Sequence, residues 1–316
     1  MPNQEIEKQL QDFVEKEERN ESDASKPIGK PITELAAPLF PGQRTPEQIS
    51  SNNQIGWQKI KLEDLPTKGY FYPVGTEIVI RSASAQEIRH WSTLQEDDLS
   101  TLDDMLNYVL ERCVGFKTPS GFSSWKDIKE IDRFYILLAV REYTFVKGEN
   151  HLQVKLSEKN SLNVTKDMID FMNFDDKLMK YYDPEKRCFV LKFKTGNVIE
   201  VSIPSVGVTS FLKNYIQRKQ NAGVSFDIDF ITFAPFVCKD WRGLTDAGYE
   251  QIVLNSNGWS ISEISVLTHL RDLFVETVSP VVKYTDDGGT ERKAPLNFLG
   301  GVKSVFLISD PFGELV

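Results

Sequence analysis

Residues Ser123 to Phe145 read SSWKDIKEIDRFYILLAVREYTF, and this stretch decides the expected fold. Its start predicts a capping box, in which the Ser124 hydroxyl accepts from the Asp127 amide and the Asp127 carboxylate reaches back. Apolar residues then recur at helical spacing, at Ile128, Ile131, Tyr135 and Leu138. Most other positions from 134 to 140 are apolar too, and a helix that is apolar nearly all round is wrapped by other elements. The stretch therefore predicts a buried central helix.

Composition and charge limit the function classes open to the chain. It has 316 residues, of which 40% are hydrophobic, as is usual for a globular protein. The formal net charge of -9 disfavours a dedicated nucleic-acid binder, which needs a basic face. Its three cysteines include no CxxC pair, which argues against a zinc ribbon or a disulfide framework. No apolar run approaches the ~20 residues of a membrane span, so we expect a product made in the cytoplasm without membrane insertion.

The predicted fold class is α+β, in three regions. Residues 1–53 are rich in proline, serine and glycine, a composition that cannot offset its ordering entropy. They are predicted to form an extended N-terminal arm, flexible or ordered by a partner. Residues 54–150 are expected to form a β entry and a three-helix unit, and residues 151–316 to add β-hairpins and helices packed on it.

Local patterns place the elements before the central helix. Thr76–Arg81 alternates around Ile78 and Ile80, which predicts a strand buried on one face. Capping-box spacing marks two helix starts, Ser84 with Glu87 and Ser100 with Asp103. Gly115 and residues 118–124 are predicted to form the loop that leads to the central helix.

The second half turns to strands and helices. Strands are predicted at 151–156 and 302–308, with hairpins at 188–203, around Thr195-Gly196-Asn197, and at 281–296. Helices are predicted at 208–220, 244–255 and 262–278, the last capped by Ser260 with Glu263. The segment 157–183 is expected to be irregular.

Paired carboxylates are the main candidates for chemistry. They occur at Asp97-Asp98, Asp103-Asp104 and Asp175-Asp176. Neighbours on a helix point about 100° apart, so such pairs do not converge on one atom. We therefore predict no catalytic, cofactor-binding or metal-binding residues.

Aromatic residues in predicted loops give the positive signal. Clusters of exposed aromatics are typical of protein interfaces, although the same residues could instead anchor loops to the core. The candidate partner-binding residues are Tyr70, Phe71, Tyr72, Phe233, Phe236, Trp241 and Phe312.

Three segments resemble a known family. They are LPTKGYFY at 65–72, IDRF at 131–134 and GGVKSVF at 300–306. They are similar to motifs of the baseplate hub and hub-assembly family of contractile, T-even-like bacteriophages. The resemblance implies a non-enzymatic virion protein of the tail baseplate. It would bind other tail and baseplate proteins, in multiple copies of a symmetric assembly, without nucleic acid.

Two alternatives remain open. The family also contains factors that help the hub to assemble and then leave, so the chain could be a transient assembly chaperone. An alternative of another class is a hydrolytic enzyme that uses Asp97/Asp98 or Asp175/Asp176.

Overall fold

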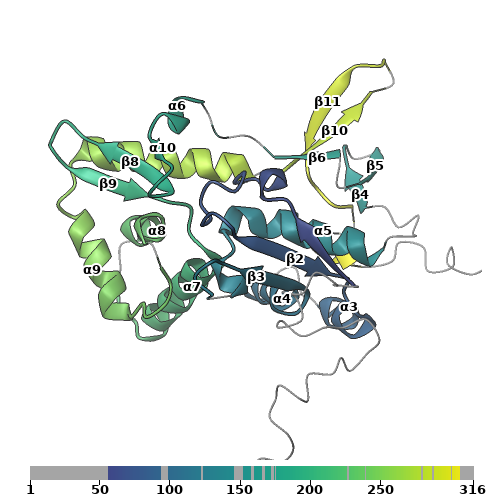
Figure 1. Cartoon of the computed structure of the whole chain (residues 1–316), viewed down its shortest axis with the longest axis horizontal. Coiled ribbons are helices and arrows are strands. Elements are labelled where there is room, and N and C mark those ends of the chain that lie inside the picture. Colours follow the sequence, from purple (N-terminus) through teal and green to yellow (C-terminus); the bar gives the residue numbers. More distant parts are fainter. Residues whose placement is uncertain are drawn as a thin grey trace, which may run out of the picture. The chain divides into compact units, whose positions relative to one another are not determined.

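The computed structural model describes residues 56–93, 99–121, 124–145, 152–157, 160–165, 168–171, 174, 176–225, 228–238, 240–278, 280–286, 288–299 and 301–306. The predicted N-terminal arm lies outside the described residues. Contacts group Trp57–Val316 into one compact unit, and its mixture of helices and small antiparallel sheets confirms the α+β fold class (Figure 1). None of the described helices is long and apolar enough to cross a membrane.

A three-stranded antiparallel sheet opens this unit. It has the order β1-β2-β3, with β1 at Trp57–Ile60, β2 at Glu77–Arg81 and β3 at Val114–Lys117. The short 3-10 helix η2 (Leu62–Asp64) follows β1. The prediction that β2 is buried on one face is wrong, because Val79 is as well covered as Ile78. The strand lies in the middle of the sheet, and helix α5 (Arg133–Thr144) packs against it. The loop predicted at Gly115 is likewise wrong, since β3 pairs with β2 there.

The predicted central helix is confirmed in α5, where every residue from Tyr135 to Arg141 is buried. It is shorter than expected. Two 3-10 turns, η3 (Trp125–Asp127) and η4 (Glu130–Asp132), precede it. Ile128 and Lys129 between them are extended, with ψ of 134° and 137°, because they pair with the chain around Ser205. The helical path is therefore interrupted at Ile128 and Lys129, where the chain pairs with the segment around Ser205.

Capping differs among the predicted helix starts. The box of Ser84 and Glu87 is confirmed at α3 (Ala85–Trp91). The box of Ser100 and Asp103 is wrong, because α4 (Leu99–Cys113) already includes Ser100. The box of Ser124 and Asp127 is also wrong: the Ser124 hydroxyl accepts from the Lys126 amide at 3.2 Å.

Small sheets form much of the remainder. The predicted strand at 151–156 is confirmed as β4 (Leu152–Lys155), which pairs with β5 (Ser161–Val164). Both predicted hairpins are confirmed, as β8 (Cys188–Lys192) with β9 (Val198–Val201) and β10 (Val281–Thr285) with β11 (Glu291–Pro295). The segment 157–183 is more regular than predicted, since it also contains β6 (Ile169–Asp170), α6 (Asp176–Met179) and β7 (Tyr182–Asp183).

Four further helices surround the β8–β9 hairpin and its neighbours (Figure 1). Three match predictions: α7 (Val206–Asn221), α9 (Asp246–Ser256) and α10 (Ile261–Val278). The fourth, α8 (Ile228–Val237), falls where aromatic loop residues were predicted. The predicted strand at 302–308 is wrong, because Val302–Phe306 forms the 3-10 helix η6.

Two large apolar clusters hold these elements. The first contains α5, the first sheet and η6, and residues from both predicted body regions share it. The second gathers around the β8–β9 hairpin and α10, with Phe189 and Phe274 fully buried. Phe71 and Ile131, although their sequence neighbours belong to the first cluster, pack into the second. The chain around these two residues therefore joins the two clusters.

Candidate functional site

The join between the clusters contains a buried polar centre. The Asp132 carboxylate is 0% exposed. It accepts hydrogen bonds from the Thr67 amide at 2.9 Å, the Thr67 hydroxyl at 2.6 Å and the Tyr72 hydroxyl at 2.7 Å. Burial raises the pKa of Asp132 to about 6, against the lowering effect of these donors. Burial likewise raises the pKa of Tyr72, so the phenol donates to the carboxylate.

Lys129 lies next to this centre. Its amide donates to the Tyr72 hydroxyl at 2.9 Å, and its ammonium donates to the Ile203 carbonyl at 3.1 Å. Burial lowers the pKa of Lys129 to about 8, opposed by the negative field of Asp132. Within the described part of the chain, the Lys129 ammonium forms no ion pair with a carboxylate. An ammonium has three donors, so this half-buried cation retains donors for another acceptor.

The Asp127 side chain holds the loop that follows α8 through its contacts with Trp241 and Arg242. Its carboxylate accepts from the Trp241 indole at 2.9 Å and pairs with Arg242, which also pairs with Asp240 at 3.0 Å. The Trp241 ring lies directly on Gly207 near the start of α7, where a Cβ atom would come within 2.4 Å of the ring. The charge of Arg242 is neutralised by its ion pairs with Asp127 and Asp240.

The turn between β7 and β8 supplies the opposite side. The Asp183 carboxylate accepts from the amides of Glu185 and Lys186, at 2.9 and 3.1 Å. Arg187 then has a φ of 53°, a left-handed conformation that costs a residue with a side chain roughly 1–2 kcal/mol. Lys186 pairs with Glu200 at 2.5 Å, whereas the Arg187 guanidinium forms no ion pair with any described carboxylate.

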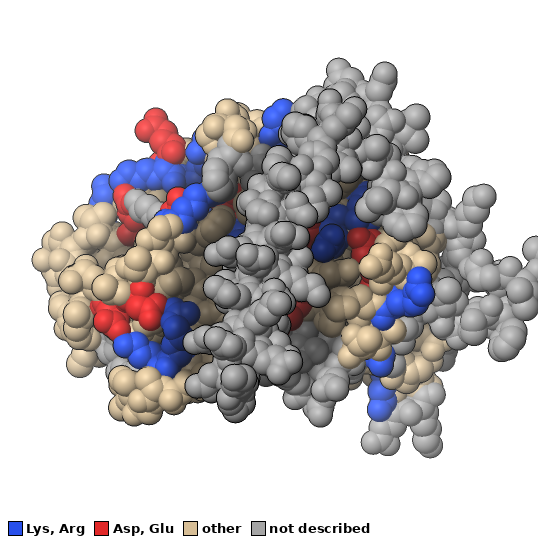
Figure 2. Space-filling view, turned by 90° about the horizontal axis from the view of Figure 1, so that it is seen from below, with Lys and Arg blue, Asp and Glu red and all other residues tan. Residues whose placement is uncertain are grey.

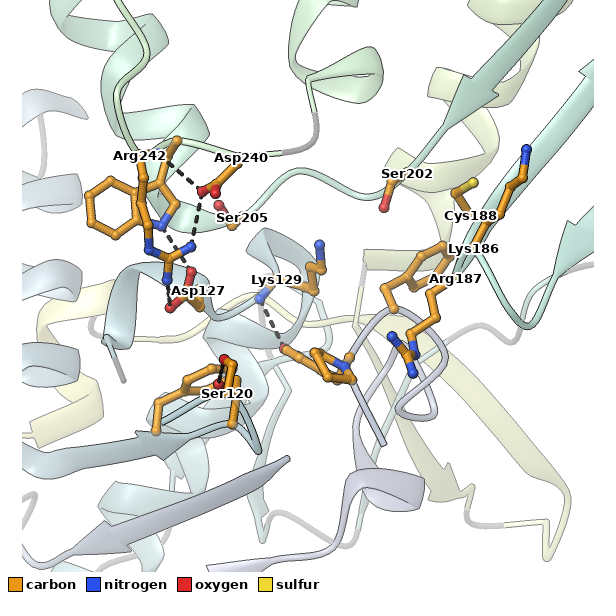
Figure 3. A pocket seen from close by; sticks show the side chains of 16 residues that line it. Ser120, Asp127, Lys129, Lys186, Arg187, Cys188, Ser202, Ser205, Asp240 and Arg242 are labelled. Atoms are coloured by element: carbon orange, nitrogen blue, oxygen red, sulfur yellow. Dashed lines mark hydrogen bonds and ion pairs between the residues drawn. The ribbon is translucent and has the colours of Figure 1, made fainter. Parts of the chain in front are cut away.

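Lys129, Arg242 and Arg187 border one pocket of about 470 Å³. In Figure 3, Asp127, Asp240 and Arg242 lie at one end, Arg187 at the other, and Lys129 between them. The pocket has a size that suits a small ligand or a few side chains. Its lining combines the polar groups with aromatic rings: Phe71, Tyr72, Pro73, Phe116, Thr118, Ser120, Asp127, Lys129, Lys186, Arg187, Cys188, Ser202, Ser205, Asp240, Trp241 and Arg242.

A second hollow, of about 600 Å³, is more apolar. It lies between α10 and the β8 region and is lined by Lys177, Leu178, Tyr181, Leu191, Lys192, Phe193, Ser265, Val266, His269, Leu270 and Leu273.

The predicted partner-binding residues have different positions. Phe71, Tyr72 and Phe233 are buried, at 4%, 3% and 6% exposure, so the expectation that they form an exposed contact surface is wrong. Their rings anchor chain segments to the core. Phe236 is half-buried and packs into the second cluster, within helix α8 rather than in a loop.

Two predicted contact residues remain accessible. Tyr70 is 40% exposed, and Trp241 is half-buried at the pocket. Phe312 lies outside the described residues.

The paired carboxylates do not form a described catalytic dyad. Asp97, Asp98 and Asp175 lie outside the described residues, and Asp176 is exposed. Asp103 forms an ion pair with Arg133 at 2.6 Å. Lys213 forms ion pairs with both Asp103 and Asp104. The described residues contain no group of three metal-ligating side chains.

Sequence reasoning missed Lys129 and Arg187. Nothing in the local pattern distinguishes either from a solvated surface cation, because what sets them apart is burial and a left-handed backbone. The sequence places Asp132 in the IDRF segment and Tyr72 among the predicted partner-binding residues, but it does not predict that the two side chains bond to each other. The best available signal was the charged IDR triplet at the start of an otherwise apolar helix.

Charges are mixed on the surface. On the left of the face shown in Figure 2, basic and acidic side chains lie close together. Pairs such as Arg218–Asp246 at 2.5 Å show the same mixing. Such pairing leaves little uncompensated positive charge for a phosphate backbone where the two signs are mixed.

Comparison of this chain with protein-family models, curated proteins and solved structures finds no match.

Proposed function

We propose that this chain is a structural component of a phage tail baseplate, in the hub region, that binds neighbouring tail proteins and has no catalytic role. The observation that supports this most is where the three family-like segments lie. Thr67 and Tyr72 of the first segment bond to Asp132 of the second in the interior. Phe306 of the third packs on Trp91, with ring centroids 5.0 Å apart.

These positions favour a scaffold over a reactive site. The Asp132 carboxylate is fully covered, so a substrate could reach it only if the fold opened. The Trp91 indole donates to the Lys303 carbonyl at 3.0 Å, which fixes the third segment against α3. The residues that carry the resemblance hold the chain in shape, as is expected of a protein that works through docking surfaces.

The proposed role predicts several copies in a symmetric baseplate, held by neighbouring tail proteins. Mass spectrometry of purified virions of the encoding phage tests it: the chain should be present in a fixed ratio to other baseplate proteins. If the chain occurs in assembly intermediates but not in finished particles, it acts as the transient chaperone instead. If a turnover activity depends on Asp97/Asp98 or Asp175/Asp176, the non-enzymatic role is wrong.

A matched pair of variants tests the contact surface. Tyr70→Ser removes an exposed ring of the predicted contact set, and Tyr181→Ser removes another exposed ring, at 55% exposure, outside that set. Complementation of a phage lacking the gene should fail or weaken with Tyr70→Ser and proceed with Tyr181→Ser. Equal particle yields would exclude Tyr70 from the contacts.

A further inference from the structure

Two cations at the polar pocket, Lys129 and Arg187, form no ion pair with a described carboxylate. Lys129 bonds only to a neutral carbonyl through its ammonium. Arg187, across the pocket in Figure 3, forms no ion pair with a described carboxylate. The other two cations of the lining are already engaged, Arg242 with Asp127 and Lys186 with Glu200.

The backbone at Arg187 gives a second, independent observation. A left-handed position at the end of a turn favours glycine or asparagine, yet an arginine is there, with a φ of 53°. The turn itself does not need this side chain, because Asp183 closes it through backbone amides and the Arg187 amide donates to the Asp183 carbonyl at 2.7 Å. The guanidinium is therefore available for a purpose other than the turn.

The start of helix α7 adds positive potential at the end of the pocket where Asp127 and Asp240 lie (Figure 3). Ser205 is its N-cap, with its side chain accepting from the Val208 amide at 3.4 Å, and Ser205 lines the pocket. The sixteen-residue helix presents the positive end of its dipole there. The pocket therefore has positive features from three separate chain segments: Lys129, Arg187 and the start of α7.

We propose that this pocket binds a singly charged carboxylate carried on an apolar or aromatic body, such as an acidic or C-terminal residue of a peptide. A planar guanidinium suits a carboxylate through paired hydrogen bonds. The rings of Phe71, Tyr72 and Phe116 supply an apolar wall. This proposal does not depend on the proposed function, because the same pocket chemistry would hold in a tail protein or an enzyme.

Charge balance favours a monoanion over a phosphate. Asp127 and Asp240 line the pocket, and Asp132 lies behind Lys129. A dianion would be repelled by these carboxylates more strongly than a carboxylate would. A monoanion adds one negative charge beside these carboxylates, whereas a dianion adds two.

Calorimetric titration of the full chain with three probes tests the proposal. The probes are N-acetylphenylalanine, its uncharged amide and inorganic phosphate. The acid should bind, and the amide should bind at least tenfold more weakly. Equal binding of acid and amide would show an apolar pocket only, and tighter binding of phosphate would overturn the choice of a carboxylate. A short peptide ending in phenylalanine with a free carboxyl group distinguishes a chain terminus from a free small acid.

Variants locate the site. Arg187→Gly removes the guanidinium and relieves the left-handed backbone, so the fold should be retained while the acid binds at least tenfold more weakly. Lys68→Gly is its matched control, because Lys68 also has a φ of 53° but does not line this pocket. Lys129→Met should also weaken binding of the acid. Unchanged affinity in Arg187→Gly would overturn the proposal, whether or not Lys129→Met folds.

Discussion

The Tyr72 hydroxyl donates a 2.7 Å hydrogen bond to the Asp132 carboxylate, 60 residues further along the chain. The same hydroxyl accepts from the Lys129 amide. Through one oxygen atom, Tyr72 therefore connects the turn before β2 to η4 and to the extended residue that precedes it. This connection fixes the floor of the polar pocket, so the stability of the fold and the shape of the pocket depend on the same group.

Asp132→Asn should destabilise the protein more at pH 4 than at pH 7.5. Burial raises the pKa of Asp132 to about 6, from a usual 3.8. Between pH 3.8 and pH 6, the folded state therefore keeps a proton on Asp132 that the unfolded state has released. The contribution of Asp132 to stability is fully present below pH 3.8 and is lost as the pH rises through 6. A pKa shift of about two units corresponds to about 3 kcal/mol of pH-dependent stability. Asparagine does not titrate, so the variant lacks this contribution.

Urea unfolding of both proteins at the two pH values measures the effect. The difference in unfolding free energy between wild type and Asp132→Asn should shrink by about 2–3 kcal/mol from pH 4 to pH 7.5. Asp176→Asn, at an exposed position, should show no such change. A difference that is the same at both pH values would contradict the raised pKa.

Gly207→Ala should destabilise the fold by about 1–3 kcal/mol, the usual cost of overpacking. The new methyl group would lie 2.4 Å from the Trp241 ring, so the indole must leave Asp127. Thermal unfolding measures the loss. Gly248→Ala is the control, because it also lies in a first helical turn and its nearest contact is an ordinary 3.4 Å. An equal effect of both substitutions would contradict the close approach.

Much of the fold could be predicted because its signals are local. The box of Ser84 and Glu87, the Thr195-Gly196-Asn197 turn and the apolar run of α5 each depend on residues within one element. The break before α5 could not be predicted in this way. Ile128 and Lys129 have helical neighbours in sequence, but they pair with the segment around Ser205, and no local pattern encodes that partner.

The candidate site was less predictable for the same reason. Aromatic residues near prolines do not reveal whether they face solvent or core, and Phe71 and Phe233 face the core. Lys129 and Arg187 gain their character from burial and backbone conformation, which arise only when distant segments meet. Sequence patterns predicted many of the elements, but not which polar side chains those elements bring together.

Arg81→Met should cost about 3–5 kcal/mol, since it leaves a buried carboxylate unpaired. Arg81 and Glu87 pair at 2.6 Å, with side chains 10% and 7% exposed. A double-mutant cycle with Glu87→Gln should show coupling, the double variant losing less than the sum of the single variants. Lys59→Met is the control, because the Lys59–Glu77 pair at 2.7 Å is well exposed and such pairs contribute about 0–1 kcal/mol. Additive losses at Arg81 and Glu87 would contradict the coupling.

Glu263→Gln should destabilise the protein at pH 7 and progressively less as the pH falls below 4.5. The Glu263 carboxylate accepts from the Thr195 hydroxyl at 2.5 Å, the Asn197 amide at 2.9 Å and the Ser260 backbone amide at 2.6 Å. It thus caps α10 and holds the tip of the β8–β9 hairpin. These donors, the Thr195 hydroxyl foremost, lower the pKa of Glu263 to about 2, from a usual 4.5. The stabilisation is therefore present above pH 4.5 and is lost as the pH falls through about 2.

Chemical denaturation at pH 7 and pH 3 measures this dependence. The stability difference between wild type and Glu263→Gln should be larger at pH 7, because glutamine still accepts one hydrogen bond but carries no charge to strengthen it. Glu185→Gln, on the exposed β7–β8 turn, should leave stability nearly unchanged at both pH values. If Glu263→Gln matched wild type at pH 7, its carboxylate would not be what joins the hairpin tip to the start of α10.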